Sequence, residues 1–138
     1  MRQDEIESFL LRLFRKISTH FDDIQLAESF FTEDADLVIV AYGSVARSAH
    51  RAMVEARAQG IKVGLLKLIT LWPFPRSFVE PLTRANKVLL VPEMNMGQIS
   101  REVKRVNQGM TLVKTLNKID GTLINPKEIL EKIREEKK

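Results

Sequence analysis

The chain of 138 residues has the length of one domain with one sizeable core, and its 44% hydrophobic and 29% charged content is ordinary for a globular protein. The absence of cysteine excludes disulfides, a thiol nucleophile and a thiolate-bound cluster, and two histidines far apart in sequence, His20 and His50, exclude a histidine-rich metal site. With no run of eighteen apolar residues and an acidic N-terminus unlike a secretory signal, we expect a cytoplasmic protein.

The net charge of +4 conceals an asymmetry. Residues 1–36 carry nine acidic and four basic side chains, a balance of −5, whereas residues 37–138 carry nine acidic and eighteen basic side chains, a balance of +9. The basic residues are dispersed with few aromatic residues among them, which favours solvated helix faces over a nucleic-acid-binding surface.

A helix is predicted near the N-terminus. Over residues 3–17, apolar side chains recur at helical spacing and form a wide stripe, with Leu11 beside it: Ile6, Phe9, Leu10, Leu13, Phe14 and Ile17. A helix this apolar must dock, either on its own domain or on a neighbour. Residues 21–31 are expected to form a linker with one extended stretch around residues 24–29.

Four strands alternating with helices are predicted after residue 36. Continuous apolar runs at 37–42, 61–68, 87–92 and 111–116 are typical of strands covered on both faces. Helices are predicted from the capping residue Ser44 to Gly60, around Phe78 to Leu82 with Pro81 limiting the length, from Gly97 to Gly109, and from Asn125-Pro126 onward. This alternation predicts parallel strands joined by right-handed crossovers in a three-layer α/β/α domain.

Three loops follow the carboxyl ends of predicted strands, where an open α/β sheet usually holds its ligand crevice. The first contains Tyr42, Gly43, Ser44 and Arg47 and has the features of an anion site at a helix start. It lacks the glycines of a dinucleotide-binding or Walker A sequence, which favours a tight, capped turn.

The second loop, TLWPFP at 70–75, carries two prolines and two large aromatic residues, Trp72 and Phe74. One interpretation is a rigid hydrophobic corner folded over the domain's own core. The other is an anchor for a partner protein, because Trp and Phe are enriched in interface cores. The residues alone leave both interpretations open.

The third loop, Glu93–Gln98, has one carboxylate and no second titrating group to complete an acid–base pair. Met94 and Met96 flank Asn95 and would make an adaptable apolar contact if exposed. We therefore predict no catalytic, cofactor-binding or metal-binding residue in the chain. The predicted site is an interface made by residues of the three loops: Tyr42, Gly43, Ser44, Arg47, Trp72, Phe74, Glu93, Met94, Asn95, Met96 and Gln98.

Four segments carry a resemblance to a known family: DADLVIVAYGSVAR, GIKVGLLKLITLWPFP, KVLLVPEMNMGQ and NPKEIL. In this order and spacing they resemble the C-terminal domain of the α subunit of 2-oxoacid:ferredoxin oxidoreductases, most nearly the 2-oxoisovalerate and 2-oxoglutarate branches. The resemblance covers roughly residues 34–130, and the helix at 3–17 resembles the segment leading into that domain. The KIDGT stretch, Lys118–Thr122, departs from the pattern with one glycine where many relatives have two.

The resemblance implies a fold like the transketolase C-terminal domain, a five-stranded mixed sheet with one antiparallel edge strand. The stretch at 24–30 is the candidate for that edge strand. It is not among the four strands predicted from the apolar runs. We accordingly divide the chain into an N-terminal helix with linker and first strand, 1–33, and an α/β domain, 34–138.

The resemblance also implies a function. Such enzymes decarboxylate a 2-oxoacid oxidatively to an acyl-coenzyme A and reduce ferredoxin. Thiamine diphosphate, magnesium and iron–sulfur clusters are then expected in other domains or subunits, with no cofactor bound by this chain. The implied role is docking within the complex rather than chemistry, and the implied partners are those other domains and subunits, with ferredoxin and coenzyme A reached through the complex and neither nucleic acid nor membrane involved.

Two other hypotheses stay open. The chain could be an independent binder of a small anion or nucleotide through the Gly43–Arg47 turn, or a scaffold whose apolar N-terminal helix makes a homodimer. The sequence does not distinguish among 2-oxoacid substrates.

Overall fold

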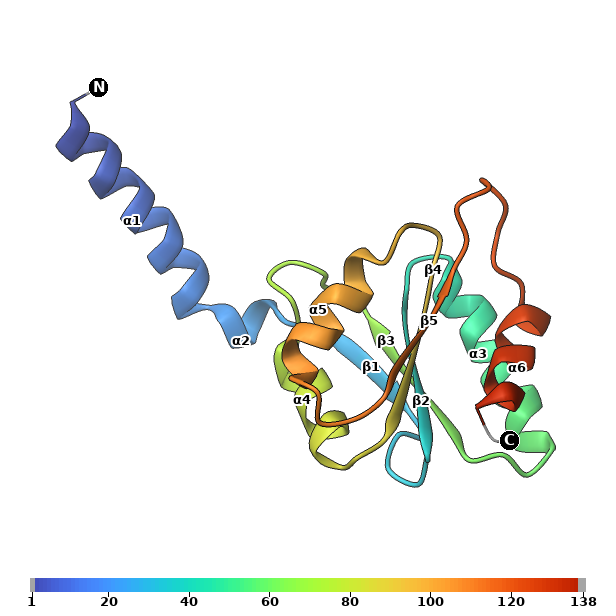
Figure 1. Cartoon of the computed structure of the whole chain (residues 1–138). Helices are drawn as coiled ribbons and strands as arrows, with labels where there is room; N and C mark the ends of the chain where they lie inside the picture. The colour runs from blue at the N-terminus through green and yellow to red at the C-terminus, as the bar shows by residue number, and fades with distance from the viewer. Residues whose placement is uncertain (1, 137–138) are drawn as a thin grey trace.

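The computed structural model describes residues 2–136, which form a layered α/β body with one long helix projecting from it (Figure 1). In chain order the elements are α1 (Gln3–Thr19), α2 (Phe21–Ile24), β1 (Ala27–Phe30), β2 (Leu37–Tyr42), α3 (Val45–Ala58), β3 (Val63–Leu68), α4 (Arg76–Arg84), β4 (Val88–Glu93), α5 (Gln98–Asn107), β5 (Val113–Asn117) and α6 (Pro126–Glu135).

The five strands make one mixed sheet in the order β1-β3-β2-β4-β5. Strands β2 to β5 pair in parallel, whereas β1 lies antiparallel to β3, with Ala27 opposite Leu68 and Phe30 opposite Leu65. The mixed sheet and antiparallel edge strand implied by the resemblance are therefore confirmed. The pattern-based prediction of four parallel strands is correct for β2 to β5 but omits β1.

Helices cover both faces of the sheet. Helices α3 and α6 pack on one face, where Ile39, Leu65 and Leu90 from the strands meet Ile129 and Ile133. Helices α4 and α5 cover the opposite face, where Val79 and Val103 from the helices pack against residues that alternate along the same strands: Val38, Val40, Leu66, Leu89 and Val91. Because both faces are buried, the strand sequences are apolar throughout instead of alternating with polar residues.

Local signals place most helix ends correctly. The Asn125 side chain accepts a hydrogen bond from the Glu128 backbone N–H at 3.1 Å, and the Glu128 carboxylate accepts one from the Asn125 N–H at 2.8 Å, which closes a capping box. Helix α3 begins after Ser44 as predicted, but the prediction that the Ser44 side chain caps it is wrong. Ser44 has helical backbone angles, φ −66° and ψ −33°, and its hydroxyl makes no capping hydrogen bond.

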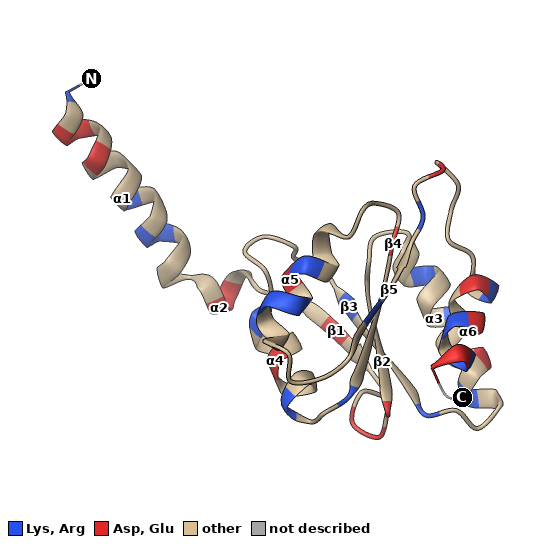
Figure 2. Cartoon of the chain, viewed as in Figure 1, with Lys and Arg blue, Asp and Glu red and all other residues tan. Residues whose placement is uncertain are grey.

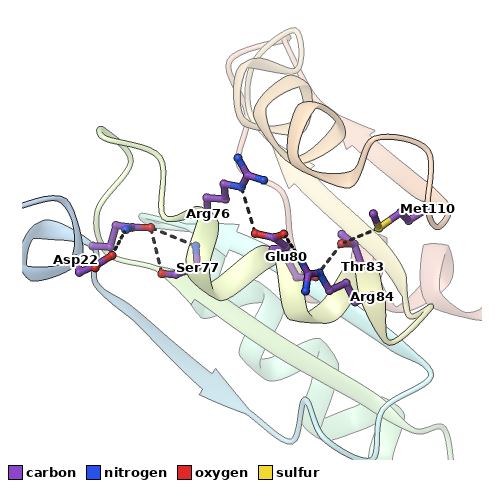
Figure 3. Close-up of polar contacts among 8 residues, drawn as sticks. Asp22, Arg76, Ser77, Glu80, Thr83, Arg84 and Met110 are labelled. Atoms are coloured by element: carbon purple, nitrogen blue, oxygen red, sulfur yellow. Dashed lines mark hydrogen bonds and ion pairs between the residues drawn. The ribbon is translucent and has the colours of Figure 1, made fainter. Parts of the chain in front are cut away.

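Helix α2 fixes the point where α1 leaves the body. The buried Gln25 side chain accepts hydrogen bonds from the backbone N–H and the hydroxyl of Ser77 on α4, at 3.2 and 3.1 Å. The Thr70 hydroxyl donates to the Ile24 carbonyl at 2.7 Å. Figure 3 shows Ser77 beside Asp22 of α2, with Arg76, Glu80 and Arg84 continuing along α4. The base of α1 is thus tied to the body by polar contacts.

Helix α1 itself contains no buried residue and points away from the sheet (Figure 1). The expected docking of its apolar stripe therefore has no partner among the described residues of its own chain. The division of the chain at residues 33 and 34 stays a prediction. Within residues 2–136, no helix has both the length and the apolar character needed to cross a bilayer.

Candidate functional site

The parallel strands β2 to β5 end at one edge of the sheet, so the loops that follow them gather there (Figure 1). Three of these loops hold the residues predicted from sequence, and the fourth joins β5 to α6. Two of the three, the loop after β4 and the loop after β3, are built in different ways.

Glu93, the last residue of β4, is fully buried. Its two carboxylate oxygens accept hydrogen bonds from the backbone N–H groups of Ile99 and Ser100 in the first turn of α5, both at 2.8 Å. Helix N-termini leave such N–H groups without intrahelical partners and favour negative charge. Glu93 therefore anchors the start of α5 to the end of β4.

A second layer of hydrogen bonds closes the loop around Glu93. The Tyr42 hydroxyl donates to Glu93 at 3.4 Å and accepts from the Asn95 side-chain amide at 2.8 Å. The Asn95 side-chain oxygen accepts from the backbone N–H groups of Gly97 and Gln98, at 2.7 and 3.0 Å. Burial, and then the negative charge of Glu93, raises the pKa of Tyr42, so the hydroxyl stays protonated as a donor.

Gly97 is required for this arrangement by its backbone. Its φ of 92° lies in the left-handed region, and a Cβ at this position would meet the Ser100 Oγ at 2.8 Å. The Asn117 side chain on β5 donates to the Asn95 carbonyl at 2.9 Å and closes the loop from the other side. The backbone from Glu93 to Gln98 is thus held by polar contacts to three strands and a helix.

The apolar side chains of this loop point outward. Met96 is 75% exposed, and Met94 is partly exposed. Met94 lines a hollow of about 200 Å³ together with Ser44, Arg47 and Leu123, the last of these from the loop after β5. The side chain of Leu123 is also largely exposed. This edge of the sheet therefore combines a fixed backbone with accessible apolar atoms.

The loop after β3 separates its two aromatic residues. Trp72 is 74% exposed, whereas Phe74 is 6% exposed and packs in the core beneath α4 and α5. The Phe74 ring therefore pins the loop to the core and leaves little of its own surface exposed, and its place in the predicted interface stays a prediction. Trp72 lines a groove of about 630 Å³ whose other lining residues include Phe21, Leu71 and Arg105.

The predicted interface residues thus fall into two groups rather than one. Met94 and Arg47 share one hollow, and Trp72 lies in another with residues of α2 and α5. Two further exposed apolar residues at this edge were not predicted from sequence: Leu71 in the loop after β3 and Leu123 in the loop after β5. Their signal was available, since a large aliphatic side chain in a loop has no core to join unless the loop folds inward.

Two of the cofactors implied by the resemblance, an iron–sulfur cluster and a magnesium ion, can be compared with the residues present. Iron–sulfur clusters need thiolate ligands and the chain contains no cysteine. Magnesium needs oxygen ligands that are free to coordinate, and both Glu93 oxygens already accept backbone N–H groups. Among residues 2–136, no group of three or more His, Asp or Glu side chains is placed to hold a metal ion.

Comparison with known proteins adds the identity of the fold. Residues 35–129 match the family described as pyruvate:ferredoxin oxidoreductase core domain II. The chain is 41% identical over 127 residues to the 2-oxoglutarate synthase subunit KorA of Methanothermobacter marburgensis, covering 92% of this chain and 34% of that one. It is 39% identical over 132 residues to the ketoisovalerate oxidoreductase subunit VorB of the same organism, covering 96% of this chain and 37% of that one. The chain therefore spans about a third of the length of these curated relatives.

Solved structures of similar proteins have the same fold as this chain. A 2-oxoglutarate:ferredoxin oxidoreductase from Magnetococcus marinus, with 2-oxoglutarate, coenzyme A and succinyl-CoA bound, superimposes with a TM-score of 0.82 and 25% identity over 99% of this chain and 24% of that chain. A split-gene transketolase, described as an inactive beta4 tetramer, is similar in fold only. Its TM-score is 0.64, with 17% identity over 80% of this chain and 40% of that chain. These findings confirm the family resemblance and the transketolase-like fold inferred from the four sequence segments.

Proposed function

We propose that this chain, which belongs to the pyruvate:ferredoxin oxidoreductase core domain II family, serves assembly of its enzyme complex rather than the chemistry. It is a domain of a 2-oxoacid:ferredoxin oxidoreductase subunit. The proposed site is the carboxyl edge of the sheet, where Trp72, Met94 and Met96 contact other domains or subunits. Arg47 and Gln98 form the polar rim of this contact.

One observation carries the proposal: inward-facing side chains fix the backbone of these loops, Phe74 in one and Glu93 with Asn95 in the other, while Trp72 and Met96 stay exposed. Glu93, Tyr42 and Asn95 are occupied in holding the backbone. Trp72 and Met96 are each about three-quarters exposed. Aromatic and methionine side chains are enriched in interface cores. The Trp72 ring loses little conformational freedom on burial, and the flexible Met96 side chain can adapt to the surface of a partner.

The activity of the whole complex is part of the same proposal. We place the chain in an enzyme that decarboxylates a 2-oxoacid oxidatively, forms an acyl-coenzyme A and reduces ferredoxin. Thiamine diphosphate, magnesium and iron–sulfur clusters then belong to other domains or subunits. The similarity to a structure with coenzyme A and succinyl-CoA bound supports this assignment. The cytoplasmic setting expected from the sequence stays a prediction.

The substrate is proposed as a class. Identity is nearly equal to a 2-oxoglutarate synthase subunit and a ketoisovalerate oxidoreductase subunit, which supports 2-oxoglutarate and a branched-chain 2-oxoacid equally. Ferredoxin reduction measured with 2-oxoglutarate, 2-oxoisovalerate and pyruvate in the assembled complex would distinguish the branches. A complex inactive with all three would contradict the proposed activity.

Association tests the docking role directly. The tagged chain is purified together with the other domains and subunits, and the Trp72→Ala/Met96→Ala variant is compared with it. We expect association to weaken roughly tenfold or more, because two anchors are truncated. Leu112→Ala is the matched control, since Leu112 is an exposed apolar residue at the start of β5, at the opposite edge. Equal association and turnover of all three proteins would overturn the docking role.

A further inference from the structure

Helix α1 presents an apolar stripe that no other part of residues 2–136 covers. Its 17 residues include no buried one, and Phe9, Leu10, Leu13 and Phe14 are all exposed. Hydrogen bonds from Ser77 on α4 to Gln25, the residue after α2, hold the base of the helix, so α1 projects from a fixed point (Figures 1 and 3). An uncovered stripe of this size marks an interaction surface.

The stripe is symmetric about the middle of the helix. Counted from the midpoint between Leu11 and Arg12, each stripe residue has an apolar counterpart at the same distance on the other side: Ile6 with Ile17, Phe9 with Phe14, and Leu10 with Leu13. An interface between two identical chains related by a two-fold axis needs such a self-complementary patch. A two-fold antiparallel pair can therefore bury the whole stripe against its own copy.

The spacing within the stripe also suits a helix pair. Ile6, Leu10, Leu13 and Ile17 are separated by four, three and four residues, which is the spacing of the a and d positions of a heptad repeat. In an antiparallel pair Ile6 of one chain faces Ile17 of the second copy, and Leu10 faces Leu13. The Phe9 and Phe14 rings flank this seam and widen it.

Charge favours the antiparallel direction. The first turns of α1 carry Asp4, Glu5 and Glu7, and its second half carries Arg12, Arg15 and Lys16 (Figure 2). Antiparallel pairing brings the acidic end of each helix beside the basic half of the other and opposes the two helix dipoles. Parallel pairing would place acidic beside acidic and basic beside basic.

The position of the body favours the same direction. Each α/β body is attached at the C-terminal end of α1 (Figure 1). A helix of 17 residues is about 26 Å long, so an antiparallel pair holds the two bodies at opposite ends. A parallel pair would bring both bodies to the same end, where they compete for space.

We infer that α1 pairs antiparallel with α1 of a second copy of this chain, through the seam of Ile6, Leu10, Leu13 and Ile17. The seam is short, so the dimer dissociates on dilution. The inference goes beyond the docking role proposed above and is tested on the 138-residue chain alone, without any other subunit. The two proposals therefore fail independently.

The first test is the mass of the chain in solution as a function of concentration, by sedimentation equilibrium. We expect a reversible monomer–dimer equilibrium. Leu10→Glu should raise the dissociation constant at least about tenfold, because two carboxylates would enter the apolar seam. Leu11→Glu is the matched control: Leu11 is equally exposed, at 54% against 47% for Leu10, but lies outside the seam.

A chain that stays monomeric at every concentration would overturn the inference and leave the stripe to another part of the oxidoreductase subunit. Equal weakening by Leu10→Glu and Leu11→Glu would overturn it too. Both residues are exposed on a helix outside the core, so circular dichroism should show an intact fold in each variant.

The second test fixes the direction by cross-linking, which is clean because the chain has no cysteine. Ile6→Cys and Ile17→Cys are made as separate variants. In an antiparallel pair these positions face each other, so a disulfide-linked dimer should form only when the two variants are mixed. Each variant alone would hold its two thiols about 16 Å apart along the helix axis, too far for a disulfide. Cross-linking of either variant alone would overturn the antiparallel arrangement.

Discussion

The loops after β3 and β4 both have a fixed backbone, but the contacts that fix it differ. Both hold an exposed apolar side chain at the carboxyl edge of the sheet, Trp72 in one and Met96 in the other. The first loop is pinned by a hydrophobic anchor, since Phe74 sinks into the core and Pro73 and Pro75 beside it are buried. The second is held by a buried carboxylate and its hydrogen bonds.

In both loops the exposure of one side chain depends on the burial of another nearby. A loop with no anchor would have to become ordered when it binds a partner. The conformational entropy lost in that step would weaken the association. Substitutions at the anchors should therefore affect folding, whereas substitutions at the exposed residues should affect association only. Four predictions test this separation, from the largest expected effect to the smallest.

Phe74→Ala should lower the free energy of unfolding by about 3 kcal/mol, because it removes a buried aromatic ring and leaves a cavity. Chemical denaturation of the chain measures the change. A loss below about 1 kcal/mol would show that the loop does not depend on its hydrophobic anchor.

Glu93→Gln should lower the free energy of unfolding by about 2 kcal/mol. The amide keeps the shape of the side chain, but its NH₂ group would replace one acceptor and face the N–H of Ile99 or Ser100, which would be left buried without a partner. Glu131→Gln, at an exposed glutamate on α6, is the control and should have little effect. Equal stability of the two variants would contradict an anchoring role for Glu93.

Tyr42→Phe should cost about 1 kcal/mol at neutral pH, since Asn95 loses its acceptor and Glu93 loses a donor. The pKa of Tyr42 is raised in the folded state by burial and by Glu93, so the stabilisation is present below the unfolded pKa of about 10 and is lost as pH rises through the folded value. Denaturation of both proteins across that range should show their stabilities converging. A difference that grows with pH would contradict the raised pKa.

Trp72→Ala should change the free energy of unfolding by less than about 0.5 kcal/mol, because the ring is largely exposed. The same denaturation series used for Phe74→Ala measures it. A loss comparable to that of Phe74→Ala would mean that Trp72 supports the fold, and the contrast between exposed and buried aromatic residues in this loop would disappear.

Most of the fold could be predicted from the sequence, because the main elements have strong local patterns. Strands β2 to β5 are continuous apolar runs, and the Asn125-Pro126 start of α6 carries its own capping signal. Strand β1 could not be found in this way. It is four residues long, with two exposed positions, and only its pairing with β3 makes it a strand.

The sequence placed the loops of the candidate site at one edge of the sheet, but it did not show which of their side chains turn inward. Parallel strands bring the loops after β2, β3 and β4 to one edge whatever their sequence. Whether Phe74 or Trp72 turns inward depends on space beneath α4 and α5, which residues distant in sequence provide. The partners of Glu93 are backbone groups, which carry no signature in the sequence.

Local pattern was enough to predict β2 to β5, the longer helices, the edge where the loops meet and the apolar stripe of α1, because periodicity and helix capping act within a few residues. The tertiary structure alone decided the pairing of β1, the burial of Phe74 and the engagement of Glu93 by α5. It also left α1 uncovered. These outcomes depend on contacts between residues far apart in the chain, and such contacts exist only once the layers have packed.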